Sequence, residues 1–167
     1  MNPVNSHMNQ PSLIVFDLDL TLWECGRATW CDCLSPPFER RRDQVFDAAA
    51  NEIQLYDDVP SILDHLDDLG IPMALASRTH EPGWARELLQ LFGIEHRFAF
   101  AEIYPEAKFS HFSSLRDDSG VAFDKMLFFD DEHRNIRDIN ELGVTCVHVA
   151  SGMTTSVLEY GLSFKAW

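Results

Sequence analysis

The sequence is short of basic residues. Its 167 residues include 13 lysines and arginines against 27 aspartates and glutamates, so the formal net charge at pH 7 is −14. A surface of this sign repels nucleic acid and anionic membranes, and we expect neither as a partner. A phosphorylated substrate would be repelled in the same way. Any site that binds one therefore has to carry its own local cations.

The sequence also lacks long apolar runs and the cysteine pattern of a zinc site. No run approaches the roughly 18 residues that a membrane-spanning helix needs. Residues 1–10 have neither the basic start nor the apolar stretch of a secretion signal, so we predict a frayed tail over residues 1–11. The four cysteines form no C-x-x-C pair, and Cys25, Cys31 and Cys33 have no fourth ligand at zinc spacing. We therefore predict reduced thiols and a cytosolic location.

The composition is that of an ordinary globular protein, with 46% hydrophobic and 24% charged residues. A chain of this length can bury a core without disulfides, and we predict a single domain over residues 12–167. The sequence gives no indication of the oligomeric state.

The most informative stretch is an apolar run that ends in two carboxylates. Leu13–Phe16 has no polar alternation, which is typical of a strand buried on both faces in the middle of a parallel sheet. Asp17 and Asp19 follow it, and both side chains point the same way if the backbone stays extended between them. Two carboxylates on one face repel each other. A shared proton or a hard divalent cation would relieve this repulsion, and the pattern alone leaves both open.

Beyond residue 57 the chain alternates predicted helices with predicted strands. The helices are expected at 58–69, 82–92, around 136–142 and at 154–162, and the strands at 72–76, 98–104, 126–129 and 144–149. This alternation predicts an α/β fold, a doubly wound parallel sheet in three layers. The carboxyl ends of its strands should share one edge, where α/β proteins bind ligands.

The segment between residues 24 and 51 does not fit this alternation. It is too long for an ordinary loop and too short for a second domain. We predict a flap over the strand ends, with a hairpin followed by a helix near residues 44–50. The basic cluster Arg40–Arg42 lies in this flap, and we expect it to face solvent rather than a substrate phosphate.

Polar groups stand just after the predicted strands. Ser77 and Arg78 follow the second strand, Lys108 follows the third, and Asp130 and Asp131 follow the fourth. Cations beside an acidic cluster suit phosphoryl transfer, in which catalysis consists mostly of positioning the phosphoryl group and neutralising its charge. The acidic cluster would hold Mg²⁺.

Within this cluster, Asp17 leaves its strand first, and we predict that it is the nucleophile and forms an aspartyl phosphate. Asp19 would donate and accept protons. A more ordinary interpretation is that Ser77 and Thr79 only cap the next helix.

Four motifs of the sequence resemble those of the haloacid dehalogenase superfamily. They are Phe16–Trp23, Ala76–Thr79, Lys108 and Phe128–Glu132. Three further segments are similar to the magnesium-dependent phosphatase-1 family: Asn51–Tyr56, Glu102–Phe112 with its Lys108, and Leu142–Cys146. The resemblance covers roughly residues 12 to 160, and four motifs in order make chance agreement unlikely.

The resemblance implies a Rossmann-like core without a large cap domain, a Mg²⁺ cofactor and hydrolysis of phosphate monoesters. Asp17 would be nucleophile and metal ligand, and Asp19 the acid and base, with its backbone carbonyl on the metal. Asp131 is favoured as a metal ligand. Asp130 would support the ligands without contacting the metal, or would be the ligand in place of Asp131. The groups that bind phosphate would be Leu18, Ser77, Arg78 and Lys108.

The family has been linked to phosphotyrosine and to sugar phosphates, including fructosamine phosphates on proteins. We therefore expect a phosphorylated small molecule or a phosphoprotein as substrate. The flap, where the resemblance is weakest, would select it.

Two other functions use similar groups. A receiver-like switch also has an acidic Mg²⁺ site and a phosphorylatable aspartate, but it needs no acid two residues further on, where this chain has Asp19. An FkbH-like domain for carrier-linked acyl transfer would call for extra catalytic residues or an attached domain.

Several residues near the motifs have ordinary structural interpretations. His111 is expected at the edge of the core. Residues 133–135 are expected in the exposed first turn of a helix, or at most in contact with the residues that form the site. Three aromatic residues would serve equally well in flap packing or in substrate contact: Trp23, Trp30 and Phe38.

Overall fold

A computed structural model describes residues 9–167, and most of the predicted tail lies outside the described residues. Its centre is a parallel five-stranded sheet in the order β7-β6-β1-β8-β9. The strands are β1 (Leu13–Phe16), β6 (Met73–Ser77), β7 (Phe100–Ile103), β8 (Met126–Asp130) and β9 (Thr145–His148). Strand β1 lies in the middle, and all four of its residues are buried, which confirms the prediction of a central strand.

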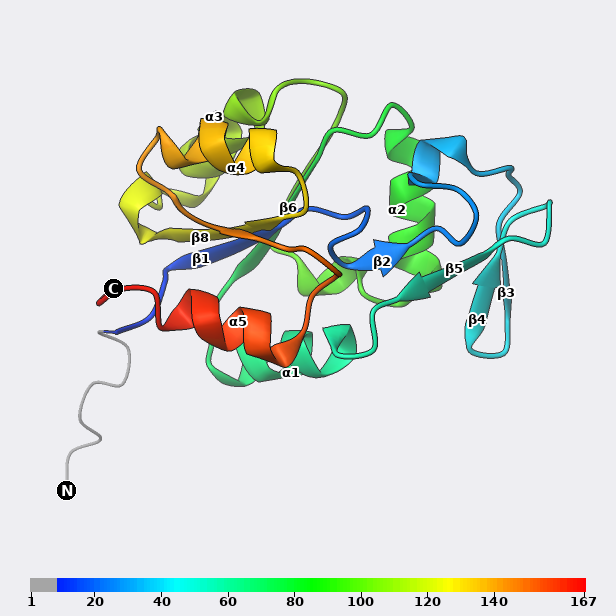
Figure 1. Cartoon of the computed structure of the whole chain (residues 1–167), viewed down its shortest axis with the longest axis horizontal. Helices are drawn as coiled ribbons and strands as arrows, with labels where there is room; N and C mark the ends of the chain where they lie inside the picture. The colour runs from blue at the N-terminus through cyan, green and yellow to red at the C-terminus, as the bar shows by residue number, and fades with distance from the viewer. Residues whose placement is uncertain (1–8) are drawn as a thin grey trace.

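Helices cover both faces of this sheet, with α3 and α4 on one face and α1 and α5 on the other (Figure 1). Side chains alternate along β1 between the two layers: Leu13 and Val15 pack under α3 and α4, and Ile14 and Phe16 under α1 and α5. The helices are α1 (Val59–Asp68), α2 (Pro82–Leu91), α3 (Lys108–Ser119), α4 (His133–Asn140) and α5 (Thr155–Leu162). The three-layer α/β prediction is confirmed.

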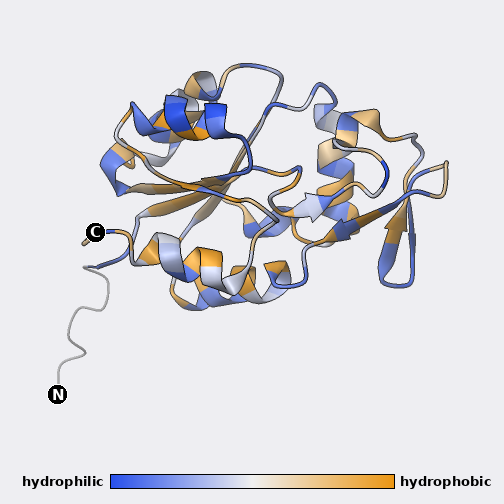
Figure 2. Ribbon diagram, viewed as in Figure 1, coloured by the Kyte–Doolittle hydropathy of each residue, from blue (hydrophilic) through white to orange (hydrophobic). Residues whose placement is uncertain are grey.

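Short 3₁₀ helices occupy some of the connections: η2 (Cys31–Cys33), η3 (Glu95–Arg97) and η4 (Phe123–Lys125). Figure 2 shows hydrophobic residues along the strands of the parallel sheet and hydrophilic residues on α4. Over the described range, none of the helices has both the length and the apolar character needed to cross a membrane.

The flap is a small antiparallel sheet beside α2 (Figure 1). Its strands follow the order β2-β5-β4-β3. They are β2 (Trp23–Glu24), β3 (Glu39–Arg41), β4 (Gln44–Phe46) and β5 (Glu52–Leu55). The predicted hairpin is present as β3 and β4, and no larger cap is found among residues 9–167.

The helix predicted near residues 44–50 is wrong. Gln44–Phe46 is strand β4, and Val45 pairs with Ile53 of β5. The Asp47 side chain then accepts the backbone N–H groups of Ala49 and Asn51, each at 2.9 Å, which turns the chain back. The alanine-rich stretch favours a helix locally, but the cross-strand pairing and this side-chain cap decide against it.

Candidate active site

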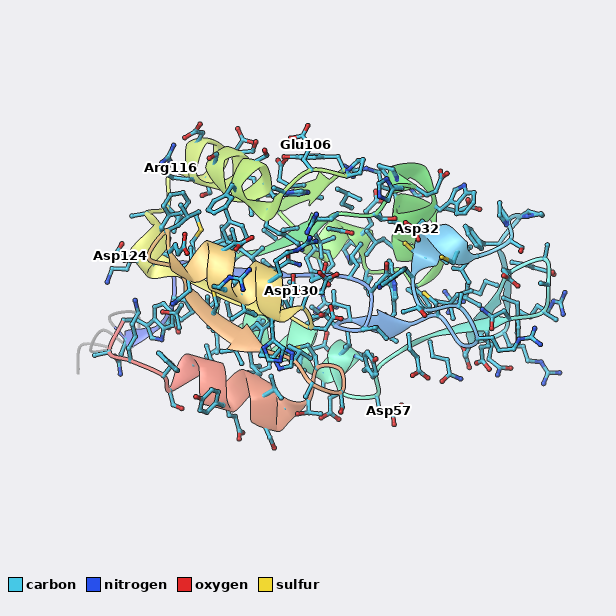
Figure 3. The ribbon with its side chains drawn as sticks, turned by 45° about the horizontal axis from the view of Figure 1, so that its top comes forward. Asp32, Asp57, Glu106, Arg116, Asp124 and Asp130 are labelled. Atoms are coloured by element: carbon cyan, nitrogen blue, oxygen red, sulfur yellow. The ribbon has the colours of Figure 1, made fainter. Side chains whose placement is uncertain are left out.

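The predicted functional groups meet at the carboxyl edge of the parallel sheet. Asp17 follows β1, Ser77 and Asp130 end β6 and β8, and Lys108 is the first residue of α3. A cavity of about 460 Å³ opens there. It is lined by Asp17, Asp19, Trp30, Asp32, Cys33, Ser77, Arg78, Thr79, His80, Glu81, Lys108, Asp131, Glu132, Arg134 and Asn135. Figure 3 shows Asp130 near the middle of the molecule and Asp32 on the flap side.

Lys108 is the cation at the bottom of this cavity, and its side chain is almost completely buried. Its Nζ lies 3.0 Å from Oδ1 of Asp17 and 3.1 Å from Oδ2 of Asp130, and it also donates to the carbonyl of Ala76. Burial opposes the charged form, but the two carboxylates outweigh it and raise the pKa of Lys108. Its three donors are all directed at protein oxygens, so Lys108 supplies a fixed positive charge beside Asp17.

Three carboxyl groups share this small volume. Oxygens of Asp17, Asp130 and Asp131 all lie within 4.8 Å of one another. Burial raises the pKa of Asp17 to about 7. The charge of Lys108 lowers this pKa and that of Asp131 raises it, but burial is the largest effect. Burial also raises the pKa of Asp130 and that of Asp131 to about 6. One lysine cannot neutralise three carboxylates, so the donor set fits a hard divalent cation.

The two acids of the fourth motif differ in how they are held. Asp130 is fully buried, and its oxygens accept from the backbone of Glu132 at 2.8 Å and from Nδ2 of Asn135 at 3.0 Å, besides Lys108. Asp131 lines the cavity, whereas Asp130 is not among the described lining residues. Asp131 is thus the acid with oxygens accessible from the cavity, and Asp130 holds Lys108 and Asn135 in place.

The Ser77–Thr79 loop forms one wall of the cavity. Oγ of Ser77 accepts the backbone N–H of Thr79 at 3.3 Å, and Oγ1 of Thr79 accepts that of Glu81 at 3.2 Å. The two hydroxyls therefore hold the loop before α2, and the interpretation that they cap this helix is wrong, because α2 has no side-chain cap. Ser77 also lines the cavity beside Arg78. Nη1 of Arg78 donates to Oδ1 of Asn135 at 3.3 Å, which joins the second motif to helix α4, directly after the fourth motif.

Asp19 lies on the flap side of the cavity. Its Oδ1 accepts from the indole Nε1 of Trp23 at 2.7 Å and from the backbone N–H of Cys31 at 3.1 Å. Burial raises the pKa of Asp19 above its ordinary value, although these hydrogen bonds act in the opposite direction. The side chain of Leu18 is fully buried, so only its backbone could serve a phosphate.

The other residues considered from the sequence either line the cavity or lie away from it. Trp23 and Phe38 are buried in the hydrophobic core that the flap shares with the parallel sheet and its helices, and of the three aromatic residues only Trp30 lines the cavity, with 49% of its surface exposed. The Arg40–Arg42 cluster is exposed and is not among the described lining residues, as predicted. Arg41 pairs with Glu39 at 2.9 Å, and Nη1 of Arg40 donates to the carbonyl of Leu91 at 3.0 Å.

His111 and Asn135 hold neighbouring parts of the site together, through contacts that the sequence did not predict. His111 is fully buried, and its Nε2 lies 2.9 Å from the carbonyl of Ser77 and 3.0 Å from that of Tyr104. Its Nδ1 lies 3.1 Å from the carbonyl of Ala107. His111 therefore ties the first turn of α3, which carries Lys108, to the end of β6. Its position three residues after Lys108, on the same helix face, is the signal that could have indicated this role.

Comparison with known proteins agrees with this geometry. A family model described as "Acid Phosphatase" matches residues 9–166. The chain belongs to this acid phosphatase family. The phosphatase is 46% identical over 154 residues to "Magnesium-dependent phosphatase 1" of Homo sapiens, covering 91% of this chain and 85% of the human one. It is 31% identical over 163 residues to a HAD-like hydrolase superfamily protein of Schizosaccharomyces pombe, with 90% and 92% of the two chains covered.

Solved structures share its fold. A HAD-superfamily hydrolase from Ehrlichia chaffeensis superposes with a TM-score of 0.67 at 14% identity, over 94% of this phosphatase and 97% of that chain. A phosphatase-containing part of protein BF1531 from Bacteroides fragilis, crystallised with Mg, gives a TM-score of 0.63 at 18% identity. That match covers 92% of this phosphatase and 40% of the other chain. The haloacid dehalogenase-like fold expected from the motifs is thus confirmed, and the chain is a phosphatase of that type.

Proposed function

We propose that Asp17 of this magnesium-dependent phosphatase attacks the phosphorus of a phosphate monoester, and that water then hydrolyses the resulting aspartyl phosphate. The observation that carries the proposal is the position of the buried Lys108 ammonium, 3.0 Å from Asp17 and 3.1 Å from Asp130, at the base of a cavity lined by polar groups. A carboxylate and an anionic phosphate approach each other only where such positive charge is fixed beforehand.

Asp17, Asp131 and the backbone carbonyl of Asp19 are the proposed metal ligands, and Asp130 supports them from behind. The clustering of three carboxyl groups within 4.8 Å supports this set, as does the magnesium dependence stated in the name of the human relative. Mg²⁺ held by these ligands would supply a Lewis acid that offsets the negative charge of the carboxylates and of a phosphate group.

The remaining residues bind the phosphate and move protons. The hydroxyl of Ser77, the guanidinium of Arg78 and the backbone of Leu18 would hold the phosphate oxygens, next to the charge of Lys108. The oxygen of Asp17 forms a bond to phosphorus while the bond to the leaving oxygen breaks. Asp19 gives that oxygen its proton, so an alcohol departs. Water then attacks the same phosphorus, Asp19 takes up its proton, and inorganic phosphate leaves Asp17 free.

The substrate is proposed to be a phosphotyrosine, a sugar phosphate or a fructosamine phosphate. The absence of a larger cap in residues 9–167 leaves the cavity accessible to substrates as large as a protein side chain. Three flap residues at the rim, Trp30, Asp32 and Cys33, would contact the leaving group. A cytosolic location also stays a prediction. It is supported by the four cysteines, all of which are free thiols.

The two alternative functions are less well supported. A receiver-like switch has no use for Asp19, yet this side chain lines the cavity and is held by the flap. Carrier-linked acyl transfer has no support from the acid phosphatase family to which the chain belongs.

The test is hydrolysis of a generic aryl phosphate with and without metal. Turnover should require Mg²⁺, stop on addition of a chelator and return when excess Mg²⁺ is restored. Turnover that persists after exhaustive chelation would refute the metal site. A panel of phosphotyrosine peptides, sugar phosphates and fructosamine phosphates then ranks substrates by kcat/KM.

A further inference from the structure

The carboxyl group of Asp19 is held through one of its two oxygens. Oδ1 accepts from the indole N–H of Trp23 at 2.7 Å, from the backbone N–H of Cys31 at 3.1 Å and from the thiol of Cys25 at 3.6 Å. An oxygen faced by three donors cannot itself carry a proton, because that hydrogen would point at another hydrogen. A proton on Asp19 is therefore confined to Oδ2.

Trp23 makes the shortest of these bonds and is itself firmly held. Its side chain is fully buried, and its ring centroid lies 6.0 Å from that of Phe92. Its carbonyl accepts the backbone N–H of Leu20 at 2.8 Å, across a turn in which Leu20 has φ +61°. Burial and the contact with Phe92 hold the indole, and this turn holds the backbone that carries it.

We propose that Trp23 is a positioning residue for the protonation of the leaving group: its N–H turns Asp19 so that the protonated Oδ2 faces the cavity. The inference rests on the proposed role of Asp19. As Asp17 bonds to phosphorus and the bond to the leaving oxygen breaks, the Oδ2 proton moves to that oxygen. Asp19 is left as a carboxylate, still held through Oδ1 for the second step.

The test compares two aryl phosphates of similar shape. Phenyl phosphate has a leaving oxygen that needs a proton, and 2,4-dinitrophenyl phosphate has one that departs as an anion. Trp23→Phe keeps an aromatic ring next to Phe92 but removes the N–H. We expect kcat/KM for phenyl phosphate to fall roughly 10-fold and that for the dinitrophenyl ester to change less than about 2-fold.

Trp84→Phe is the matched control. Trp84 packs edge-on against Phe38 of the flap, with ring centroids 6.0 Å apart, and is not among the described residues that line the cavity. This variant should leave both kcat/KM values unchanged. Cys25→Ala removes the weakest donor to Asp19 and should give a smaller loss, about 2-fold, again with phenyl phosphate alone.

Equal losses with the two esters, or no loss with either, would show that Trp23 only packs the flap and would overturn the inference. If Trp23→Phe does not fold, Cys25→Ala decides in the same way, since only a loss confined to phenyl phosphate supports the inference. Asp19→Asn separates the two proposals: it should lower kcat/KM for phenyl phosphate by roughly 10²-fold more than for the dinitrophenyl ester. If it affects both esters equally, the proposed role of Asp19 fails. If it distinguishes them and Trp23→Phe does not, only the inference about Trp23 fails.

Discussion

The edge of the parallel sheet and the flap contribute to the same cavity in different ways. At the sheet edge, charged groups are buried and hold one another: Lys108 bridges Asp17 and Asp130 with almost no exposed surface. In the flap, the ion pair of Arg41 with Glu39 is exposed, and what fixes the segment is hydrogen bonding of backbone groups to Asp47 and Asn51. The sheet edge therefore carries the proposed phosphoryl chemistry, and the flap supplies the hydrogen-bond donors to Asp19 and part of the cavity lining.

The largest effect is expected at the sheet edge, from Asp17→Asn. This change removes the proposed nucleophile and keeps the size of the side chain. We expect kcat with an aryl phosphate to fall by roughly 10³-fold or more. Thermal unfolding should stay cooperative, because Lys108 retains its pairing with Asp130. Substantial turnover in a metal-loaded, folded variant would mean that another group attacks phosphorus.

The contrast between buried and exposed charge is tested by Lys108→Met beside Arg41→Met. Removing the buried ammonium leaves Asp17 and Asp130 without their cation and should destabilise the protein by about 3–5 kcal/mol, besides abolishing activity. Arg41→Met, at an exposed pair, should change neither stability nor kcat measurably. Denaturant unfolding and steady-state kinetics of both variants check this. Similar losses of stability in the two variants would show that the buried ion pairs of the sheet edge matter no more to folding than the exposed pair of the flap.

An effect smaller than that of Lys108→Met is expected in the flap, at Asp47. Burial opposes the charge of its carboxylate, but three backbone N–H donors, those of Ser35, Ala49 and Asn51, outweigh burial and lower the pKa of Asp47. A lowered folded-state pKa means that this stabilisation is present above the unfolded pKa and is lost as pH falls through the folded value.

Asp47→Asn should therefore lower Tm by roughly 2–4 °C at neutral pH, and the gap to the unmodified protein should close in acid. Thermal melts of both proteins between pH 7 and pH 3 measure it. A gap that stays constant over this range would show that the charge of Asp47 is not what holds the flap.

The same division separates what the sequence could predict from what it could not. Asp17, Ser77, Lys108 and Asp130 each stand next to a buried apolar run, and the common orientation of parallel strands is enough to bring such ends together. Helix α3 was not predicted beyond its start at Lys108, because its serines and charged residues hide the buried face made by Phe112 and Leu115.

In the flap, local patterns mislead. The alanines after Asp47 favour a helix. The pairing of β4 with β5 joins residues on either side of these alanines, so the propensity of the segment itself does not reveal it. The bond between Trp23 and Asp19 depends on the turn at Leu20, whose positive φ no helix or strand pattern predicts.

The most direct test of the account is to find where the phosphoryl group resides during turnover. Asp19→Asn, loaded with Mg²⁺ and given phosphorus-labelled 2,4-dinitrophenyl phosphate, should complete the first step and be slow in the second. After an acid quench and peptide mapping, the account predicts the label on Asp17. A label on any other residue, or unlabelled protein in samples that have already released one equivalent of dinitrophenol, would contradict it.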